Sequence, residues 1–230
     1  NNAPCHEIVT RGPDLEGENN GLHSLPTPIS TPGFDVAPYL TATSCITRDP
    51  DTGVQNMGTY RGGIKSSNRI GLKMFVNMRQ GGHTHWQKWK TKEKKMPIAI
   101  MVGGPPSLAY VSSQKIREGL DEISVAGALA RAPIRVVKAK TVDLLVPAEA
   151  EIIIEGLIDT EMLEPEGPFG ESHGHINLEE YNFILDVTAI TRRSDAIMPS
   201  IISQVTPSES SVIKRVGMEP KFLNHLQEGL

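Results

Sequence analysis

Short apolar runs separated by turn-forming residues limit what this sequence can fold into. Glycine and proline together make up 38 of the 230 residues, about 17%, compared with about 12% in an average chain. Between the turns, β-branched and apolar residues recur with partial alternation, as expected of strands. This pattern favours a turn-rich β or mixed fold over a helix bundle. The expected strands span residues 39–47, 69–77, 96–102, 134–145, 149–158 and 181–190.

Helical signals are fewer. Residues 83–95 carry tryptophans and several lysines, which is typical of a helix with a solvated face. Residues 121–132 have apolar side chains at helical spacing and stop at Pro133. Thr206 followed by Pro207 indicates a further helix start. We therefore expect an α+β, β-dominated fold, with helices inserted among the strands of a small barrel or sandwich.

Charge and hydropathy argue against two kinds of binding partner, nucleic acid and the membrane. The chain has 23 Lys and Arg against 27 Asp and Glu, a net charge of −4, so it lacks the basic excess that binds nucleic acid. No apolar run approaches the roughly 20 residues of a membrane-spanning helix. Cys5 and Cys45 are too few for a disulfide framework and suit a reducing cytoplasm as small buried residues. We expect a cytoplasmic protein that binds neither nucleic acid nor a membrane.

A loop with two carboxylates is the sharpest chemical feature. Glu166 and Glu171 flank the sequence Gly-Pro-Phe-Gly, in which two glycines and a proline force a tight turn. A carboxyl group in such a loop can act as a general acid when apolar surroundings or a charged neighbour raise its pKa. Spacing alone favours the simpler interpretation that both are solvated loop charges.

The remaining candidates are weak when taken one at a time. Asn56 offers a neutral oxygen to a hard cation, and Arg61 offers a planar fork to a carboxylate. Glu122 opens a predicted helix, where acidic residues are ordinary. Two His-x-His pairs, at residues 83–85 and 173–175, could chelate a metal. A zinc hydrolase would also need a third ligand and a base, so surface histidines are the simpler interpretation.

Four longer motifs follow one another along the chain. They are DPDTGVQNMGTYR at residues 49–61, DEISVAGAL at 121–129, VPAEAEIIIEG at 146–156 and PEGPFGE at 165–171. Any one of them could arise by chance. The ordered set, within about residues 3–205, resembles the UbiD family of reversible decarboxylases.

The resemblance implies a domain organisation. We expect a linker or N-terminal extension at residues 1–36 and a split β-barrel, flavin-reductase-like domain that binds prenylated FMN at residues 37–180. Residues 181–230 would begin an incomplete C-terminal α/β domain. Because members of this family are much longer than 230 residues, we expect a segment of a longer protein, or a subunit whose ends dock on a partner.

The resemblance also implies a cofactor and a divalent cation. In this family an asparagine, a histidine and a glutamate hold a divalent ion, usually Mn2+, that bridges to the phosphate of prenylated FMN. Asn56, His83 and Glu122 fall at these positions, with His85 as the second choice for the histidine. Such a donor set suits Mn2+, which would offset the phosphate charge.

A potassium ion often lies nearby in this family. We expect its site around the backbone of Ser112 and Ser113. The expected cofactor-binding residues then include Met57, Gly58 and Gly82 besides these serines, the cation ligands and Arg61.

Arg61, Glu166 and Glu171 match the Glu–Arg–Glu catalytic network of the family. Arg61 would orient the substrate carboxylate and pair with Glu166, and Glu171 would deliver a proton to the carbon that loses CO2. The implied enzyme is a carboxy-lyase that reversibly decarboxylates an aromatic or α,β-unsaturated carboxylic acid without oxidising it. His175 stands where many relatives carry an aromatic residue, which bears on the choice of substrate.

The resemblance implies two partners, namely a flavin prenyltransferase that supplies the cofactor and further copies of the chain in a homo-oligomer. The alternative function is a non-catalytic, flavin-binding accessory subunit of a larger carboxylase or decarboxylase complex. Retention of all three catalytic residues argues for the enzyme.

Overall fold

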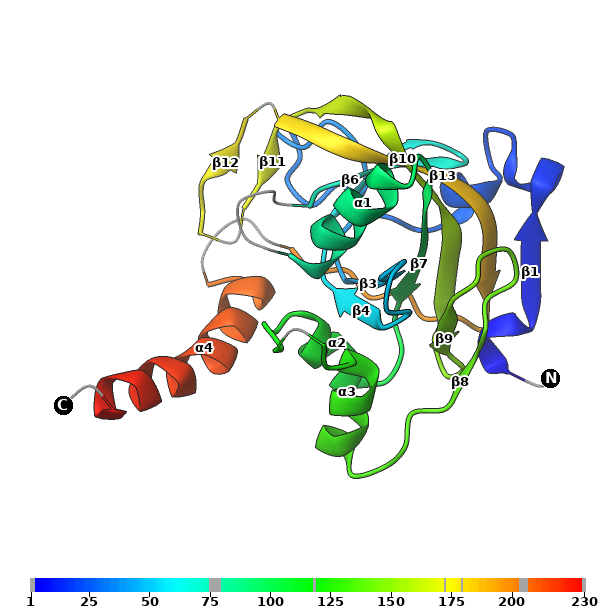
Figure 1. Ribbon diagram of the computed structural model, residues 1–230. Helices are drawn as coiled ribbons and strands as arrows, with labels where there is room; N and C mark the ends of the chain where they lie inside the picture. The colour runs from blue at the N-terminus through cyan, green and yellow to red at the C-terminus, as the bar shows by residue number, and fades with distance from the viewer. Residues whose placement is uncertain are drawn as a thin grey trace.

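The computed structural model describes residues 3–74, 80–117, 119–171, 173–178, 180–202 and 207–228. One nine-stranded antiparallel sheet dominates it (Figure 1), with the order β2-β5-β6-β13-β10-β7-β3-β4 and with β1 also paired to β13. The strands of this sheet are β1 (Ile8–Arg11), β2 (Tyr39–Leu40), β3 (Thr43–Arg48), β4 (Gln55–Gly58), β5 (Gly62–Ser66), β6 (Arg69–Leu72), β7 (Met96–Val102), β10 (Ile152–Glu166) and β13 (Glu180–Arg192).

Two small hairpins and several helices complete the described chain. The hairpins are β8 (Val136–Lys138) with β9 (Leu145–Pro147), and β11 (Phe169–Gly170) with β12 (Ile176–Asn177). The α-helices are α1 (Gly81–Thr91), α2 (Pro106–Ser112), α3 (Glu122–Ala130) and α4 (Glu209–Glu228), and the short 3-10 turns are η1 (Pro4–His6), η2 (Gly12–Leu15) and η3 (Gly21–Ser24). The α+β, β-dominated class with inserted helices is confirmed. Within the described ranges, no helix is both long and apolar enough to cross a membrane.

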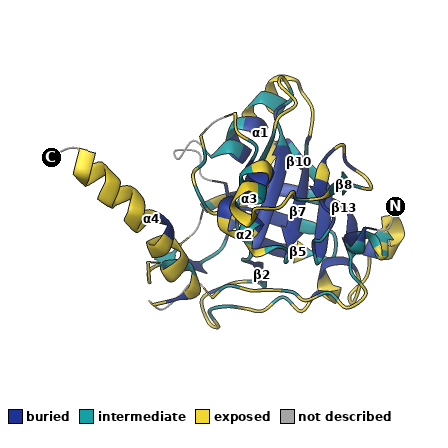
Figure 2. Cartoon of the chain, turned by 90° about the horizontal axis from the view of Figure 1, so that it is seen from below, coloured by how far each residue is buried: buried dark blue, intermediate teal, exposed yellow. Residues whose placement is uncertain are grey.

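The central strands are buried on both faces (Figure 2). Ile152 and Ile154 of β10 pack into one apolar cluster, which the tryptophans of α1 cover. Ile153, between them, packs into a second cluster with Leu108 of α2 and Ile123 of α3. Alternate side chains therefore face two separate cores, which explains why the sequence of β10 begins as a continuous apolar run.

Strands β10 and β13 form the longest antiparallel pair and bend along their length (Figure 1). Their register shifts between Glu155 and Gly156. A Cβ atom at Gly156 would lie 2.2 Å from the carbonyl oxygen of Asp186, so only glycine allows this approach of the two backbones. The pair carries the chain from the core at Ile152 to Glu166, beside the carboxylate loop.

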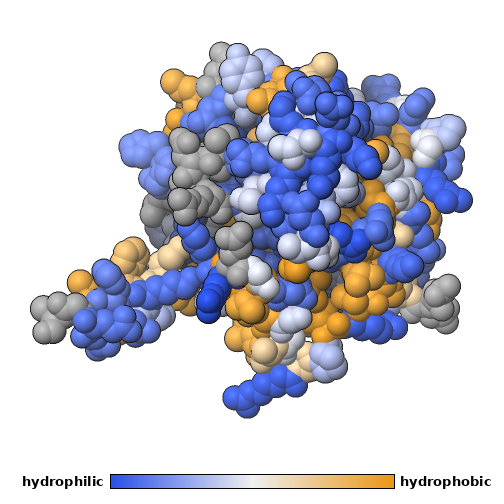
Figure 3. Space-filling view, viewed as in Figure 1, coloured by the Kyte–Doolittle hydropathy of each residue, from blue (hydrophilic) through white to orange (hydrophobic). Residues whose placement is uncertain are grey.

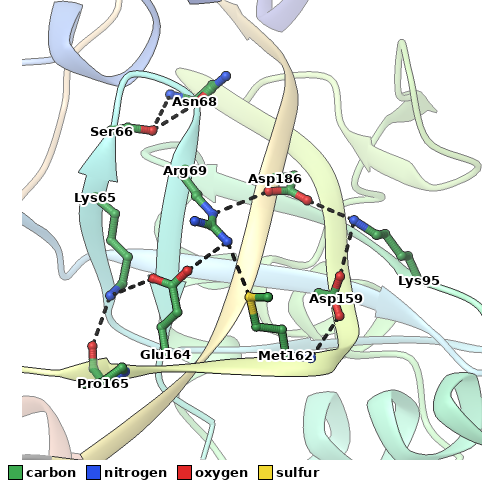
Figure 4. A network of polar contacts seen from close by, with 10 residues as sticks. All are labelled: Lys65, Ser66, Asn68, Arg69, Lys95, Asp159, Met162, Glu164, Pro165 and Asp186. Atoms are coloured by element: carbon green, nitrogen blue, oxygen red, sulfur yellow. Dashed lines mark hydrogen bonds and ion pairs between the residues drawn. The ribbon is translucent and has the colours of Figure 1, made fainter.

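A chain of ion pairs crosses one face of this sheet (Figure 4). Glu164 of β10 lies 3.1 Å from Lys65 and 2.8 Å from Arg69, the N–O distances in each case. Arg69 and Lys95 both pair with Asp186 of β13, at 3.6 and 3.0 Å. Each exposed pair contributes little alone. Together they join β5, β6, β10 and β13 next to the end of β10, where Glu166 lies.

The N-terminal segment is part of the fold. We expected residues 1–36 to be a linker or extension without regular structure, but β1 pairs with β13. The backbone N–H of Cys5 donates to the carbonyl of Ala148 at 3.1 Å, and Leu15 and Leu22 are buried. A four-residue strand between 3-10 turns is too short to show periodicity, which is why the sequence pattern missed it.

The expected boundary at residue 181 falls inside the sheet, because β13 pairs with β10, β6 and β1. The apolar alternation of this strand was recognised, but its partners are remote in sequence. Beyond it, α4 extends away from the body (Figures 1 and 2). That α4 opens a further domain stays a prediction.

Three of the elements expected from the sequence differ in detail from the structure or lie partly outside the residues that it describes. The strand expected at 134–145 is the β8–β9 hairpin, whose turn is held by Glu155, since this buried carboxylate accepts from the backbone N–H groups of Lys140 and Thr141. Helix α4 begins at Glu209, with Ser208 accepting from the N–H of Ser211 at 3.3 Å. Thr206 and the 75–79 part of an expected strand lie outside the described residues.

Replacing Gly156 by alanine tests the close approach of β10 and β13. We expect Gly156→Ala to lower the free energy of unfolding by about 3 kcal/mol, because the new methyl group meets backbone that cannot turn aside. Gly12→Ala is the control, since a Cβ there meets no atom within 4 Å and only the left-handed φ of +59° opposes it, at about 1 kcal/mol. Urea denaturation measures both, and equal losses would contradict the assignment.

Candidate active site

Arg61 lies between two carboxylates. Its Nε donates to Glu166 Oε1 at 2.8 Å and its Nη2 to Glu166 Oε2 at 2.7 Å, a bidentate pair. Its Nη1 donates to Glu171 Oε1. The side chains of Arg61 and Glu166 are 9% and 1% exposed, and that of Glu171 is 19% exposed. Of the three groups, Glu171 is therefore the most accessible from solvent.

These groups come from distant parts of the chain. Arg61 stands between β4 and β5, Glu166 ends β10, and Glu171 follows β11. The Cζ atom of Arg61 lies 4.6 Å from the centroid of the Phe169 ring, which packs against Tyr39, so a cation–π contact adds to the ion pairs. Burial opposes the Arg61 charge, but hydrogen bonds to Glu166 and the charges of both carboxylates prevail and raise its pKa.

A tight turn fixes the backbone of Glu171. Its N–H donates to the carbonyl of His175 at 2.9 Å, and its own carbonyl accepts from Gly174 at 3.0 Å. The rings of His173 and His175 lie 5.3 Å apart on the exposed side of this turn. The second His-x-His motif thus shapes the loop that presents Glu171.

Strand β4 meets the N-terminus of α1 through two glycines. A Cβ atom at Gly81 would lie 2.0 Å from Asn56 Oδ1, and one at Gly82 would lie 2.9 Å from the Tyr60 ring. The N–H of Gly82 donates to the Tyr60 hydroxyl at 3.1 Å. Burial raises the pKa of Tyr60 to about 12, so the phenol stays protonated. The paired glycines place Asn56 directly against the helix that carries His83.

The same strand meets the start of α3. The N–H of Met57 donates to Glu122 Oε2 at 3.0 Å, and Asp121 caps the helix by accepting from Ile123 N at 3.1 Å. Burial raises the pKa of Glu122. A cation bound beside this carboxylate would stabilise its ionised form. The Glu122 carboxylate therefore lies against the backbone of β4 at Met57, the residue after Asn56.

The two histidines of α1 have different surroundings. His83 is buried, with ring centroids 6.0 Å from Trp86 and 5.8 Å from Phe183, and burial lowers its pKa, which favours the neutral, metal-binding imidazole. No hydrogen bond joins its ring to another described residue. His85 Nδ1 lies 2.9 Å from Thr47 Oγ1. His83 therefore has the more available ring nitrogens.

The expected cation ligands suit a hard divalent ion. Asn56 Nδ2 is buried without a hydrogen-bond partner among the described residues; this group can donate to an anion such as a phosphate, whereas a cation would bind the amide oxygen Oδ1. Among all the residues that the structure describes, no three His, Cys, Asp or Glu side chains form a metal-binding group. The expected set depends on the amide of Asn56 as its third donor, and amide, imidazole and carboxylate together fit Mn2+.

The end of α2 is tied to the residue after β4. Ser112 Oγ lies 2.9 Å from the hydroxyl oxygens of both Ser44 and Thr59, and its carbonyl accepts from Thr59 N at 3.0 Å. Ser113 is exposed and donates to the carbonyl of Tyr110. Gly58 is required because a Cβ there would lie 2.4 Å from the Tyr60 hydroxyl. These expected cofactor-binding residues therefore surround one end of β4.

An open groove of about 790 Å³ lies apart from the Arg61 cluster, between α3, β8 and β9. Figure 3 shows apolar side chains gathered on this lower part of the surface. Its apolar lining includes Val54, Ile123, Ile134 and Leu145. The groove shares no lining residue with the Arg61 cluster.

Four residues near the site were not identified from the sequence. Asp35 accepts from Gly170 N at 3.1 Å, and Tyr39 packs at a tilt on the Phe169 ring, which lies against Arg61. Tyr60 joins β4 to α1. Asp35 lies in the segment that we interpreted as a linker, and nothing in its sequence surroundings indicates a site residue.

The large antiparallel sheet, with an arginine held between two carboxylates, fits the flavin-binding class that the motifs suggested. The family model "UbiD: 3-octaprenyl-4-hydroxybenzoate carboxy-lyase Rift-related domain" matches residues 1–205. The chain belongs to the UbiD family.

Similar proteins agree with this assignment. An uncharacterized protein of Aquifex aeolicus is 37% identical over 217 residues, which are 92% of this chain and 44% of that protein. The UbiD-class enzyme HmfF from Pelotomaculum thermopropionicum, solved in complex with FMN, matches with a TM-score of 0.91 and 30% identity over 100% of this chain and 49% of that one. Vanillic acid decarboxylase of Sedimentibacter hydroxybenzoicus matches with a TM-score of 0.80 and 28% identity over 89% and 42%. The chain thus spans about half the length of these relatives.

Removing Glu166 tests the buried ion pair. We expect Glu166→Ala to lower the free energy of unfolding by about 3 kcal/mol, because Arg61 stays buried with one of its two partners lost. Glu164→Ala, which breaks the more exposed pairs to Lys65 and Arg69, is the control and should cost about 1 kcal/mol or less. Chemical denaturation compares the two, and a larger loss for the control would refute the interpretation.

Proposed function

We propose that the protein is a carboxy-lyase that uses prenylated FMN to remove CO2, reversibly and without oxidation, from an aromatic or α,β-unsaturated carboxylic acid. The observation that carries this proposal is Arg61 held by Glu166 with Glu171 beside it. Two relatives support it: a form of HmfF solved in complex with prFMN, 30% identical, and vanillic acid decarboxylase, 28% identical.

Arg61 is suited to bind the carboxylate of the substrate. A guanidinium has five N–H donors, and the contacts to Glu166 and Glu171 engage three of its nitrogens with one bond each. Two N–H groups, one on Nη1 and one on Nη2, remain to bind a further carboxylate. Glu166 holds the guanidinium in place, so the substrate meets a fixed rather than a mobile cation.

Glu171 is suited to deliver the proton. It is the most exposed member of the cluster, and its backbone is held by the turn at His175. Its carboxyl group would protonate the carbon that loses CO2 and regain a proton from solvent. In the reverse direction, the same carboxylate would remove the proton from that carbon.

The proposed cofactor needs a cation site and a phosphate site. When bound, prenylated FMN supplies an electron-accepting ring system for the carbon that loses CO2. Asn56, His83 and Glu122 would hold Mn2+ beside the flavin phosphate, and the backbone around Ser112 and Ser113 would hold K+. A flavin prenyltransferase would supply the cofactor. We also propose a homo-oligomer; an evolved dimeric form of HmfF is among the similar structures.

Glu171→Gln tests the proton donor. The variant removes the acidic proton with little change in volume, so we expect unchanged flavin content and a decarboxylation rate at least about 100-fold lower. Glu161→Gln, at a side chain that is 73% exposed, is the matched control and should keep the rate. CO2 release from a panel of aromatic and unsaturated acids is the measurement. A near-normal rate in Glu171→Gln would remove Glu171 from this role.

The same panel distinguishes the enzyme from a non-catalytic accessory subunit. An accessory subunit would retain the flavin and its visible absorbance but release no CO2 from any acid. That result with the wild-type protein, loaded with prenylated FMN and Mn2+, would refute the proposed activity.

Elemental analysis tests the cation ligands. We expect Asn56→Ala, Glu122→Ala and His83→Ala each to reduce bound Mn2+ about tenfold or more and to reduce flavin content with it, because the cation joins the phosphate to the protein. His23→Ala, at an exposed histidine, is the control. Loss of Mn2+ in His85→Ala but not in His83→Ala would assign the ligand to His85.

A further inference from the structure

Residues 28–38, which we call the strap, cross the loop that carries the proposed catalytic carboxylates. The strap is anchored at both ends, because Pro28 O accepts from Tyr39 N at 3.4 Å and Pro38 O accepts from Ile64 N at 3.0 Å. Between these anchors, Val36 packs so closely on Gly167 that a Cβ there would lie 2.5 Å from Val36 Cγ2. The strap therefore lies directly against the loop between Glu166 and Glu171.

Asp35 is the polar contact between the strap and this loop. Its Oδ1 accepts from the N–H of Gly170 at 3.1 Å, and its Oδ2 accepts from the N–H of Thr31 at 2.8 Å. The N–H of Asp35 itself donates to Thr31 O at 3.0 Å. The residue is 8% exposed, so one buried carboxylate joins the strap turn to the loop through two backbone amides.

The contact falls one peptide bond away from the proposed proton donor. Gly170 pairs with Ile176 across the β11–β12 hairpin, and its N–H, which donates to Asp35 Oδ1, is its polar link to the strap. Glu171, the next residue, is held on its other side by His175 O. Its carboxylate then meets Arg61. The strap and the histidine turn together set where that carboxylate lies.

We infer that Asp35 is a positioning residue for the proton donor, which it serves by fixing the Gly170–Glu171 peptide so that the Glu171 carboxyl group meets Arg61 and the substrate carbon. The inference rests on the proposed role of Glu171. Without Asp35, the buried N–H of Gly170 loses its acceptor, which is unfavourable enough to move the loop.

The experiment compares Asp35→Ala and Asp35→Asn in the complete protein loaded with prenylated FMN. We expect flavin content within twofold and KM within threefold of wild type for both variants. We expect kcat to fall at least tenfold in Asp35→Ala. Asp35→Asn should stay within threefold of wild type, because its amide oxygen can still accept from Gly170 N and only the bond from Thr31 N, within the strap, is lost.

Asp49→Ala is the matched control. Asp49 is also 8% exposed and also accepts backbone N–H groups, from Asp51 at 2.8 Å and Thr52 at 3.4 Å, but it lies in another loop and pairs with Lys88. We expect Asp49→Ala to lose about as much thermal stability as Asp35→Ala does. Its kcat should stay within twofold of wild type. Equal kcat losses in Asp35→Ala and Asp49→Ala would reduce Asp35 to a structural role and overturn the inference, as would a rise in KM at constant kcat.

A second measurement does not depend on activity. In a double-mutant cycle on the unfolding equilibrium, the effects of Asp35→Ala and Glu171→Gln on the unfolding equilibrium constant should depart from additivity by at least fivefold, whereas those of Asp49→Ala and Glu171→Gln should be additive. Additivity of the first pair would overturn the inference even if the enzyme is active. If the Asp35 and Glu171 substitutions are coupled but the protein decarboxylates no acid, the proposed function is refuted. The contact between Asp35 and the loop that carries Glu171 would then still be established.

Discussion

The ion pairs of Arg61 are the interaction on which the arrangement of the site depends. A guanidinium at 9% exposure is stable only when opposite charges offset its own. Strand β10 meets this requirement by running far enough past the core to bring Glu166 to Arg61, and β11 adds Phe169 and then Glu171. The bend and register shift of β10 at Gly156 are thus part of how the carboxylates reach the arginine.

One short stretch of chain joins the two halves of the site. Asn56 lies in β4 and Arg61 only five positions later, with Tyr60 between them bonded to the first turn of α1. Glu122 reaches the same strand through Met57 N. One proposed cation ligand, Asn56, and one proposed catalytic residue, Arg61, therefore belong to the same short segment, so a displacement of β4 would affect both groups.

The sequence predicted the fold class and the residues with strong local patterns, but not the contacts made across the chain. The continuous apolar run from Ile152 indicated a buried strand, whereas the partners of β13 lie far away in sequence and could not be inferred from it. Likewise, Arg61 and Glu166 are 105 positions apart, and only the family motifs connected them. Asp35 was missed because a single buried carboxylate in a glycine- and proline-rich segment has no periodicity to detect it by.

The burial of the two thiols bears on their reactivity and on the proposed cation site. Burial raises the pKa of Cys5 to about 11 and that of Cys45 to about 12, so neither forms a thiolate near neutral pH. Both sulfurs are also buried, with 0% exposure, so solvent-borne alkylating agents and peroxide have little access to them in the folded chain. At the proposed cation site, the donors are therefore nitrogen and oxygen atoms rather than these sulfurs.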